Sequence, residues 1–560
     1  MNDDLPFIIS WWEDTESLYG TLDRSVNSLT NLIKDFSVDS LIVEFSLLMN
    51  KINCSNDMLG YEEILKYLNR TEKRRLLTTN DYQTSPFIHK QQLYTAMRIA
   101  FKYAVGTETI TDQNRHLIGK FLLEINSFSE EILKSRDESN EMIRTNNMTA
   151  DLIPSYLIST LLKPGNLFTQ QALGREYFRY VKYWEDNPED NDLVLLERDF
   201  QQITGIKIKD YFSSLFALGV PIMNNNPSKI YINLPTFFSS IKRTDFLPVI
   251  TKRFCMKEKD YSEQWSDEQE DLATLLTPQF TPLIQYPLCL RADNDAIILD
   301  KSLLGLKILE DPYWILENYY LEVNKMKKWR LVPAVFGRLW QEYVVTQIKT
   351  NLTKDIQLLD IEEEHLDLKK ADILIEREDC TLIIELKHLI FSINTKSGNL
   401  TAFDNDCNKI FGEEHGLVQI DETIKTLSLQ NSKKTIYRIL IVDEKIPQNF
   451  IFFKHYEDTY NHWTPPYPNC SYPIIICKDE LEQLVTIGIE NFVRLLKLRD
   501  YELRNKGENG FVYDKNSLTT LDTLQRNPEL SKHLKINRYS QGLYDLYTTY
   551  TREILFPERR

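Results

Sequence analysis

Two short apolar runs, separated by a polar interruption, constrain the fold of this chain more than any other feature. Asp372 opens the run Ile-Leu-Ile, and Glu385-Leu386-Lys387 closes the run Leu-Ile-Ile. Between the runs stands Arg377-Glu-Asp-Cys380. Apolar, β-branched runs of this length around a polar break predict two antiparallel strands joined by a tight turn. If the turn consists of Glu378 and Asp379 alone, Arg377 faces Cys380 and Asp372 faces Glu385.

This register has a chemical consequence. Directly opposed residues have Cβ atoms ~5 Å apart on one face of a sheet, and Lys387 points to the same face as Glu385 because side chains alternate along a strand. Two adjacent carboxylates repel each other, and a hard divalent cation relieves that repulsion. Such a cation acidifies water and neutralises charge during phosphodiester cleavage, while a nearby lysine orients or deprotonates the attacking water or stabilises the pentavalent state. The pattern therefore predicts that Asp372 and Glu385 bind Mg²⁺ (or Mn²⁺) beside a catalytic Lys387.

The alternative interpretation is an ordinary surface hairpin whose three charges balance one another. Both faces of the predicted hairpin are apolar, however. One face carries Ile373, Ile375, Leu382, Ile384 and Leu386, and the other combines Leu374 and Ile383 with the acids. A hairpin that is apolar on both faces is buried, and unpaired acids there are costly, which favours the metal site.

The arrangement resembles the PD-(D/E)xK nuclease superfamily, the restriction-endonuclease-like fold, over residues 331–445, which is about a fifth of the chain. The resemblance implies a central mixed sheet flanked by helices, with Asp372 and Glu385 as metal ligands and Lys387 as the catalytic lysine. The family often places a Gly-x-x-aromatic-acid pattern on the preceding helix. Here that stretch is Gly337-Arg-Leu-Trp340-Gln341-Glu342, so the acid position falls on Gln341.

Helical geometry separates Gln341 from Glu342. The apolar face of this helix centres on Trp340 and Tyr343, and at about 100° per residue Gln341 lies nearer to it than Glu342 does. We therefore expect Gln341 to approach the site and to hydrogen-bond a metal-bound water, with one well-held metal rather than two. Glu342 is expected at the surface.

Two further residues lie near the pattern. The family often carries a glutamine on the helix after the Glu-x-Lys motif, and Gln419 in Leu417-Val-Gln-Ile is the candidate; the alternative is a polar surface residue. His388 follows Lys387 and points to the opposite face, so packing is expected there rather than catalysis.

Periodicity divides the rest of the chain. Spacings of three and four predict helical regions over 1–150 and 151–275, which could be continuous, then a small β-hairpin and helix connector over 276–330. A nuclease-like domain is expected over 331–480 and a helical extension over 481–560. The predicted class is therefore α+β, with a mostly helical N-terminal region followed by an α/β domain.

Bulk properties set the remaining limits. The 560 residues exceed one ordinary domain, and no apolar run is long enough for a membrane helix. Seven scattered cysteines without a CxxC pair, and an acidic N-terminus, predict reduced thiols in the cytoplasm. The net charge of −16 argues against a generally basic nucleic-acid surface, although the cluster Lys325–Arg330 could track a phosphate backbone.

These observations predict a metal-dependent DNA endonuclease. By family analogy only, its setting is prokaryotic defence against foreign DNA, with the helical N-terminal region regulating the enzyme or binding a protein partner or second copy. Two alternatives stay open. One is an inactive nuclease-fold subunit that acts as a scaffold, and the other is a nuclease directed at RNA.

Overall fold

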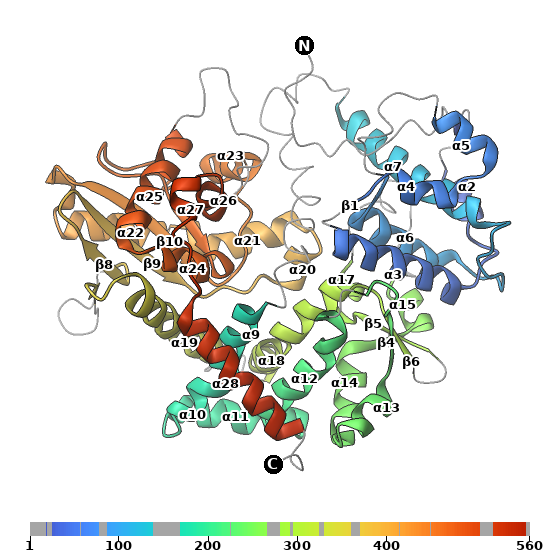
Figure 1. The fold of residues 1–560 in the computed structure, drawn as a ribbon, viewed down its shortest axis with the longest axis horizontal. Coiled ribbons are helices and arrows are strands. Elements are labelled where there is room, and N and C mark those ends of the chain that lie inside the picture. The colour runs from blue at the N-terminus through green and yellow to red at the C-terminus, as the bar shows by residue number, and fades with distance from the viewer. Residues whose placement is uncertain are drawn as a thin grey trace.

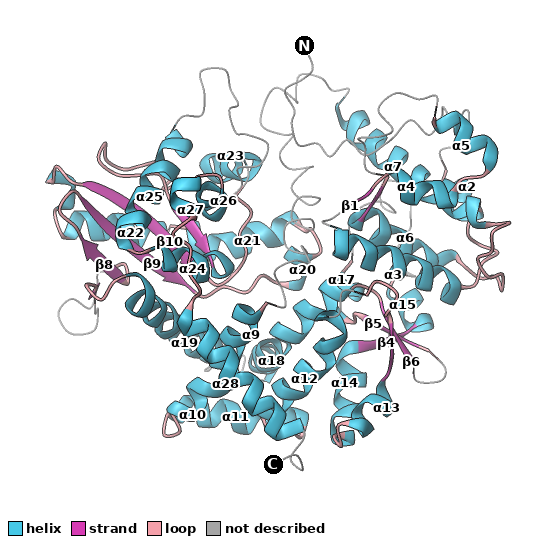
Figure 2. Ribbon diagram, viewed as in Figure 1, coloured by secondary structure: helices cyan, strands magenta, loops and turns pink. Residues whose placement is uncertain are grey.

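The structure is a computed structural model that describes residues 18–19, 25–55, 58–77, 87–137, 169–223, 226–265, 280–291, 295–323, 330–359, 370–413, 415–448, 450–504 and 519–555. Helices dominate, and two mixed sheets of five and four strands lie among them, with one further two-stranded pair (Figure 2). The predicted α+β class is confirmed. No helix of the described ranges is long and apolar enough to cross a membrane.

The five-stranded sheet has the order β11-β10-β9-β8-β7 and contains the strands predicted around the motif. Its members are β7 Gln357–Leu358, β8 Ile373–Glu376, β9 Cys380–Lys387, β10 Thr435–Val442 and β11 Ile474–Cys477. The three strands β9, β10 and β11 run parallel, and β7 and β8 are antiparallel additions. The central strand β9 is buried along almost its whole length, as expected for a strand covered on both faces.

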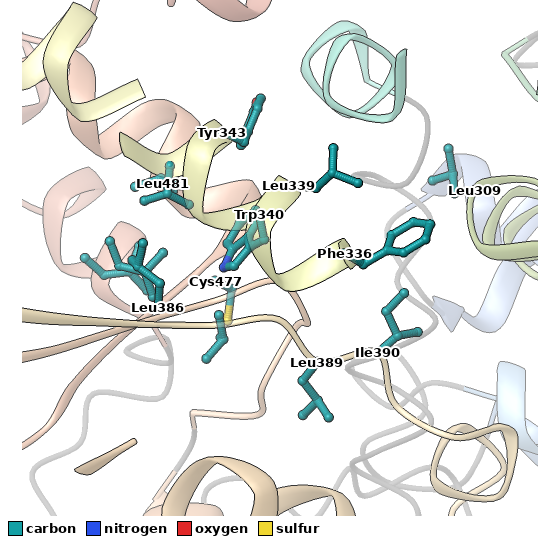
Figure 3. Close-up of a cluster of buried hydrophobic side chains, with 14 of the residues drawn as sticks. Leu309, Phe336, Leu339, Trp340, Tyr343, Leu386, Leu389, Ile390, Cys477 and Leu481 are labelled. Atoms are coloured by element: carbon teal, nitrogen blue, oxygen red, sulfur yellow. The ribbon is translucent and has the colours of Figure 1, made fainter. Parts of the chain in front are cut away.

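Helices cover both faces of this sheet, and we call residues 330–504 the sheet domain. Helix α19 (Leu331–Gln347) packs Phe336, Leu339 and Trp340 over the chain segment that carries Leu386 and Ile390 (Figure 3). Helix α22 (Leu417–Thr426) lies on the opposite face, where Lys387 points. The other helices of the sheet domain are η5 Ile348–Leu352, α20 Ile393–Lys396, α21 Leu400–Phe411, η6 Leu429–Asn431, α23 Phe450–Thr459, α24 Lys478–Leu484, η7 Val485–Ile487 and α25 Ile489–Arg504.

A group of helices lies below the sheet domain in Figure 1 and packs against it. We call its residues, 169–223 and 301–323, the helical body. It contains α9 Gln170–Tyr177, η3 Phe178–Lys182, α10 Tyr183–Asp186, α11 Asn191–Thr204, α12 Ile208–Met223 and α18 Lys301–Val323. After α26 (Thr520–Gln525) and α27 (Pro528–Ser531), the C-terminal helix α28 (Arg538–Leu555) returns to pack on α9. The sheet domain, the helical body and α28 share one hydrophobic core.

The N-terminal unit has a second core of its own. It contains α2 Val26–Asn31, α3 Val38–Ser55, β1 Met58–Leu59, α4 Tyr61–Ile64, η1 Leu65–Tyr67, α5 Arg70–Leu76, β2 Ile88–His89, α6 Lys90–Tyr103 and α7 Arg115–Asp137. Asp300, directly before α18, joins this unit to the helical body. Its carboxylate accepts hydrogen bonds from Asn53 and Tyr94 and lies 3.5 Å from Lys90 Nζ.

The four-stranded sheet separates the two cores and has the order β3-β6-β5-β4. Leu288 and Ile298 belong to the core of the helical body, whereas Cys289 and Ile297 belong to the N-terminal core, because side chains alternate between the faces of a sheet. Its strands are β3 Tyr231–Asn233, β4 Cys255–Lys257, β5 Leu288–Leu290 and β6 Asp295–Ile298, and the helices nearby are α13 Leu234–Ser240, η4 Thr244–Phe246, α14 Leu247–Phe254, α15 Glu258–Gln264 and α17 Thr281–Gln285.

One sequence expectation needs correction here. The strands β3 and β4 were missed, because residues 151–275 were expected to be helical and three-residue strands carry no alternation signal. The helix expected within residues 276–330 is α18, which begins at Lys301 and carries Pro312 in its interior. The nearby carbonyl of Leu309 accepts a hydrogen bond from the Tyr180 hydroxyl at 3.2 Å, a partner from another helix that local sequence cannot reveal.

Candidate active site

The β8–β9 hairpin has the register that the sequence predicts. Ile373 pairs with Ile384 and Glu376 with Thr381, and the Arg377 amide donates to the Cys380 carbonyl at 2.9 Å. The turn therefore consists of Glu378 and Asp379. One step beyond the Ile373–Ile384 pair, Asp372 stands opposite Glu385.

Asp372 is held from three sides. Its Oδ2 accepts a hydrogen bond from the Leu386 amide at 2.7 Å, and its Oδ1 accepts one from Gln341 Nε2 at 3.4 Å. Directly before it, the Ala371 amide donates to Thr423 Oγ1 at 2.7 Å, which ties the start of β8 to helix α22. Burial raises the pKa of the Asp372 carboxyl above its usual value, against the lowering effect of the Leu386 amide.

Glu385 is the most buried member of the group, with 1% of its surface exposed. Its Oε1 lies 2.6 Å from Lys387 Nζ, whereas its Oε2 is buried and has no hydrogen-bond partner among the described residues. Burial, and then the neighbouring Asp372 carboxyl, raise the pKa of Glu385 well above the usual range. Lys387 offsets part of this cost, and a proton shared by the two acids or a cation bound between them would offset more.

The orphaned Oε2 of Glu385 beside Asp372 suits a hard divalent cation. Mg²⁺ is often bound through only one or two carboxylates and keeps several of its waters. Within the described ranges, no cluster of three or more Asp, Glu, His or Cys side chains is arranged to hold a metal. The donor set is thus two carboxylates, with Gln341 in the place of a third.

Lys387 and Gln419 meet on the same face as the acids. Lys387 Nζ donates to Gln419 Oε1 at 2.5 Å, and the Lys387 side chain is 20% exposed. The same Gln419 oxygen accepts the Gly416 amide at 3.1 Å. Gly416 has a φ of 45°, and a Cβ there would lie 1.9 Å from the Ile410 carbonyl oxygen, so only glycine permits this helix start.

Helix α19 presents Gln341 to the site and Glu342 to solvent. Both side chains are exposed, but of the two it is Gln341 that reaches Asp372. Their neighbour Trp340 is buried, and its indole Nε1 has no hydrogen-bond partner in the part of the chain described. The structure thus brings together all five residues singled out from the sequence: Gln341, Asp372, Glu385, Lys387 and Gln419.

A second group of charges adjoins the site and was not singled out from the sequence. Asp443 follows β10, and its carboxylate accepts hydrogen bonds from His388 Nδ1 at 2.7 Å and from Arg179 of the helical body. His388 packs between Tyr313 and Phe336, in agreement with the packing role expected for it. The sequence shows only that Asp443 directly follows an apolar strand. Its partner Arg179 lies far away in the sequence, so the pair could not be predicted.

Some sequence features fall outside the described residues, among them most of the basic cluster Lys325–Arg330. Comparison with protein-family models, with curated proteins and with solved structures finds no match to this chain. The interpretation of the site therefore rests on its own residues and geometry.

Proposed function

We propose that this chain is a metal-dependent endonuclease of the PD-(D/E)xK type that hydrolyses phosphodiester bonds of DNA. The observation that carries the proposal is the buried Asp372–Glu385 pair with an unpartnered carboxylate oxygen and Lys387 Nζ 2.6 Å from the other oxygen of Glu385. In metal-assisted phosphodiester hydrolysis, the paired acids bind the metal and the lysine at their side supplies a positive charge near the phosphate.

Each residue has a role that follows from its contacts. Asp372 and Glu385 would hold Mg²⁺ or Mn²⁺, which when bound supplies Lewis acidity and lowers the pKa of coordinated water. Lys387, partly exposed and held by Glu385 and Gln419, is placed to orient the attacking water or to stabilise charge on the phosphate. Gln341 donates to Asp372 through its side-chain Nε2. The rest of its side-chain amide can orient a second polar group at the exposed edge of the site.

The broader setting is part of the proposal. By family analogy the enzyme acts in prokaryotic defence against foreign DNA, and the helical N-terminal region restrains it or binds a partner. An inactive scaffold subunit is the second candidate, favoured by Gln341 at the acid position and by the net charge of −16. A nuclease directed at RNA is the third.

A plasmid-cleavage assay with Mg²⁺ or Mn²⁺ tests the proposal. We expect wild-type protein to convert supercoiled DNA, and Asp372→Asn, Glu385→Gln and Lys387→Met each to lose about 10²-fold or more in rate. Glu342→Gln is the matched control, because this acid lies beside Gln341 on the same helix but faces solvent, and it should cleave like wild type.

The outcomes separate the candidates. Cleavage that persists in both Asp372→Asn and Lys387→Met would refute the site. Cleavage of single-stranded RNA in place of DNA would move the proposal to the RNA nuclease. A wild-type protein that cuts neither nucleic acid with any divalent metal would favour the scaffold.

A further inference from the structure

A buried chain of charges connects the helical body to the strand ends beside the candidate site. Arg179 Nη1 donates to Glu176 Oε2 at 2.9 Å, and its Nη2 donates to the carboxylate of Asp443. Asp443 is fully buried, and the Arg179 side chain is only 6% exposed. Arg179 lies in the π-helical turn η3, an irregular turn that is common at functional sites.

Asp443 fixes the end of β9 through two different groups. Its backbone amide donates to the carbonyl of Lys387 at 3.1 Å. Its carboxylate accepts from His388 Nδ1, on the residue that follows Lys387. Val442 and Lys387 are the last registered pair of the parallel strands β10 and β9, so Asp443 closes the ladder at the point from which Lys387 projects.

The charge balance shows why Arg179 is needed there. Burial alone would penalise the Asp443 carboxylate, yet Arg179, then Lys478 and His388, hold its pKa far below the usual range. The Nζ of Lys478 is 3.8 Å from Asp443 Oδ1, beyond hydrogen-bond distance. Without Arg179, the carboxylate would keep only the long Lys478 contact and the His388 hydrogen bond, and a buried charge this poorly paired is expensive.

We propose that Arg179 is a positioning residue of the candidate active site, which acts through Asp443 to hold the strand ends that place Lys387. This inference rests on the proposed function. It implies that the sheet domain cleaves efficiently only while its β10 end is docked on the helical body. Docking on α9 and η3 would then be a point at which the helical part controls the enzyme.

The chain offers a closely matched control. Arg175 lies one turn before Arg179 and is equally buried, and it donates to Glu482 Oε1 at 2.6 Å and to Asp479 Oδ1 at 3.2 Å. Both acids belong to α24 of the sheet domain. Arg175 Nε also donates to Glu176 Oε1 at 3.3 Å, so Arg175→Met removes one partner of Glu176 and a buried ion pair across the same interface, but it leaves the contact of Arg179 with Asp443 intact.

Two measurements on the full chain test the inference. In plasmid cleavage, Arg179→Met should lower kcat by about 10²-fold, the effect of a small misplacement of a catalytic group. The metal concentration for half-maximal rate should stay unchanged, because Asp372 and Glu385 are untouched. In hydrogen exchange, the Asp443 amide should exchange about tenfold faster in Arg179→Met, while β11 and α12 exchange as in wild type.

Arg175→Met should lower the melting temperature but change neither kcat nor the exchange of the Asp443 amide. Arg179→Lys should recover part of kcat, since lysine keeps the charge of arginine but not its two-pronged hydrogen-bond geometry. If Arg179→Met does not fold, Asp443→Asn takes its place, with the same expected pattern. Equal losses in Arg175→Met and Arg179→Met, or exchange that rises throughout the protein, would overturn the inference. Absence of cleavage by wild type contradicts the proposed function instead, and the exchange of the Asp443 amide then still decides whether Arg179 holds the strand ends.

Discussion

The acids of the candidate site are costly to the fold in the absence of a cation. Glu385 is almost completely buried, and Asp372 stands opposite it with a raised pKa of its own. Natural proteins retain such pairs where function needs them, and neutralising a carboxylate then stabilises the protein while it removes activity. The stability of variants is therefore a test of the metal site that does not depend on finding the substrate.

We predict that Glu385→Gln raises the unfolding free energy of the metal-free protein by about 1 kcal/mol, because the isosteric amide removes the repulsion with Asp372. Glu385→Gln also removes the ion pair with Lys387, but Lys387 is partly exposed, so water can solvate its charge. Mn²⁺ should raise the melting temperature of wild type and of Glu342→Gln but leave that of Glu385→Gln unchanged. An equal Mn²⁺ shift in all three proteins would exclude Glu385 as a ligand.

Glu317 of α18 provides a separate prediction on pH. Its Oε2 is buried and finds no hydrogen-bond partner in the described part of the chain, and burial raises the pKa of Glu317 to about 7. The folded state therefore binds more protons than the unfolded state between about pH 4.5 and pH 7, so this carboxyl lowers stability as the pH rises through that window. After allowance for solvent screening, Glu317→Gln should stabilise the protein by about 1 kcal/mol at pH 8.

At pH 4 the same substitution should have almost no effect, because the carboxyl is then protonated in both states. Denaturant unfolding of wild type and Glu317→Gln at both pH values measures the difference. A gain that is equal at both pH values would mean that packing, not titration, explains it.

Local pattern sufficed for the residues of the hairpin but not for those of the ion-pair chain. The alternation of side chains and a two-residue turn place Asp372, Glu385 and Lys387 together, and these rules hold whatever surrounds the hairpin. The contact between Arg179 and Asp443 joins positions 264 residues apart. It depends on how η3 docks on the end of β10, which no local period records.

At the scale of elements, long amphipathic helices and buried strands could be read from periodicity. The apolar face of helix α19 was expected to centre on Trp340 and Tyr343, and both are buried. Shorter or irregular elements could not be predicted. The π-helical turn η3 lies between α9 and α10, η5 ends α19, and β7 has only two residues.

Two helical glycines give opposite predictions for the same substitution. A Cβ at Gly337 of α19 would meet nothing within 4 Å, whereas a Cβ at Gly174 of α9 would lie 2.8 Å from the backbone carbonyl of Ser540 in α28. Gly337→Ala should therefore stabilise the protein by about 0.5–1 kcal/mol through helix propensity. Gly174→Ala should destabilise it by about 1–3 kcal/mol, because two helix backbones must separate.

Thermal unfolding of the two variants against wild type checks this pair. Exchange in α28 should accelerate in Gly174→Ala and stay unchanged in Gly337→Ala. Stabilisation by both substitutions would show that α9 and α28 are not in close contact in solution.

At the scale of the whole molecule, the sheet domain and the helical body form one core, and the four-stranded sheet separates it from the N-terminal core. Buried ion pairs join the sheet domain to the helical body at several points. Besides Arg179 and Asp443, Lys396 of α20 lies 2.6 Å from Glu310 of α18 and 3.5 Å from Glu444. Asp443 and Glu444, which follow β10, are thus both joined to the helical body. Asp443 binds Arg179 directly, and Glu444 shares Lys396 with Glu310 of α18.

This arrangement predicts that the sheet and the helical body unfold as one unit that depends on Lys396. Its side chain is 3% exposed, and its positive charge lowers the pKa of both acids more than any other neighbour does among the described residues. Lys396→Met would leave Glu310 and Glu444 buried beside each other, with neutral hydrogen-bond donors and the more distant charge of Lys478 as their remaining partners. We expect a loss of about 3 kcal/mol or more, as for other buried pairs that lose one partner.

Lys409→Met is the matched control for this last prediction. Lys409 also pairs with an acid, Asp406, at 2.7 Å, but 62% of its side chain is exposed, and Asp406 keeps hydrogen bonds from Ser392 and Thr395. Its removal should cost less than about 1 kcal/mol. If the molecule is cooperative, Lys396→Met speeds hydrogen exchange in α18 and β10 alike, since Glu310 lies in α18 and Glu444 follows β10. Faster exchange confined to α20, or a loss no larger than that of Lys409→Met, would show that the two parts open independently.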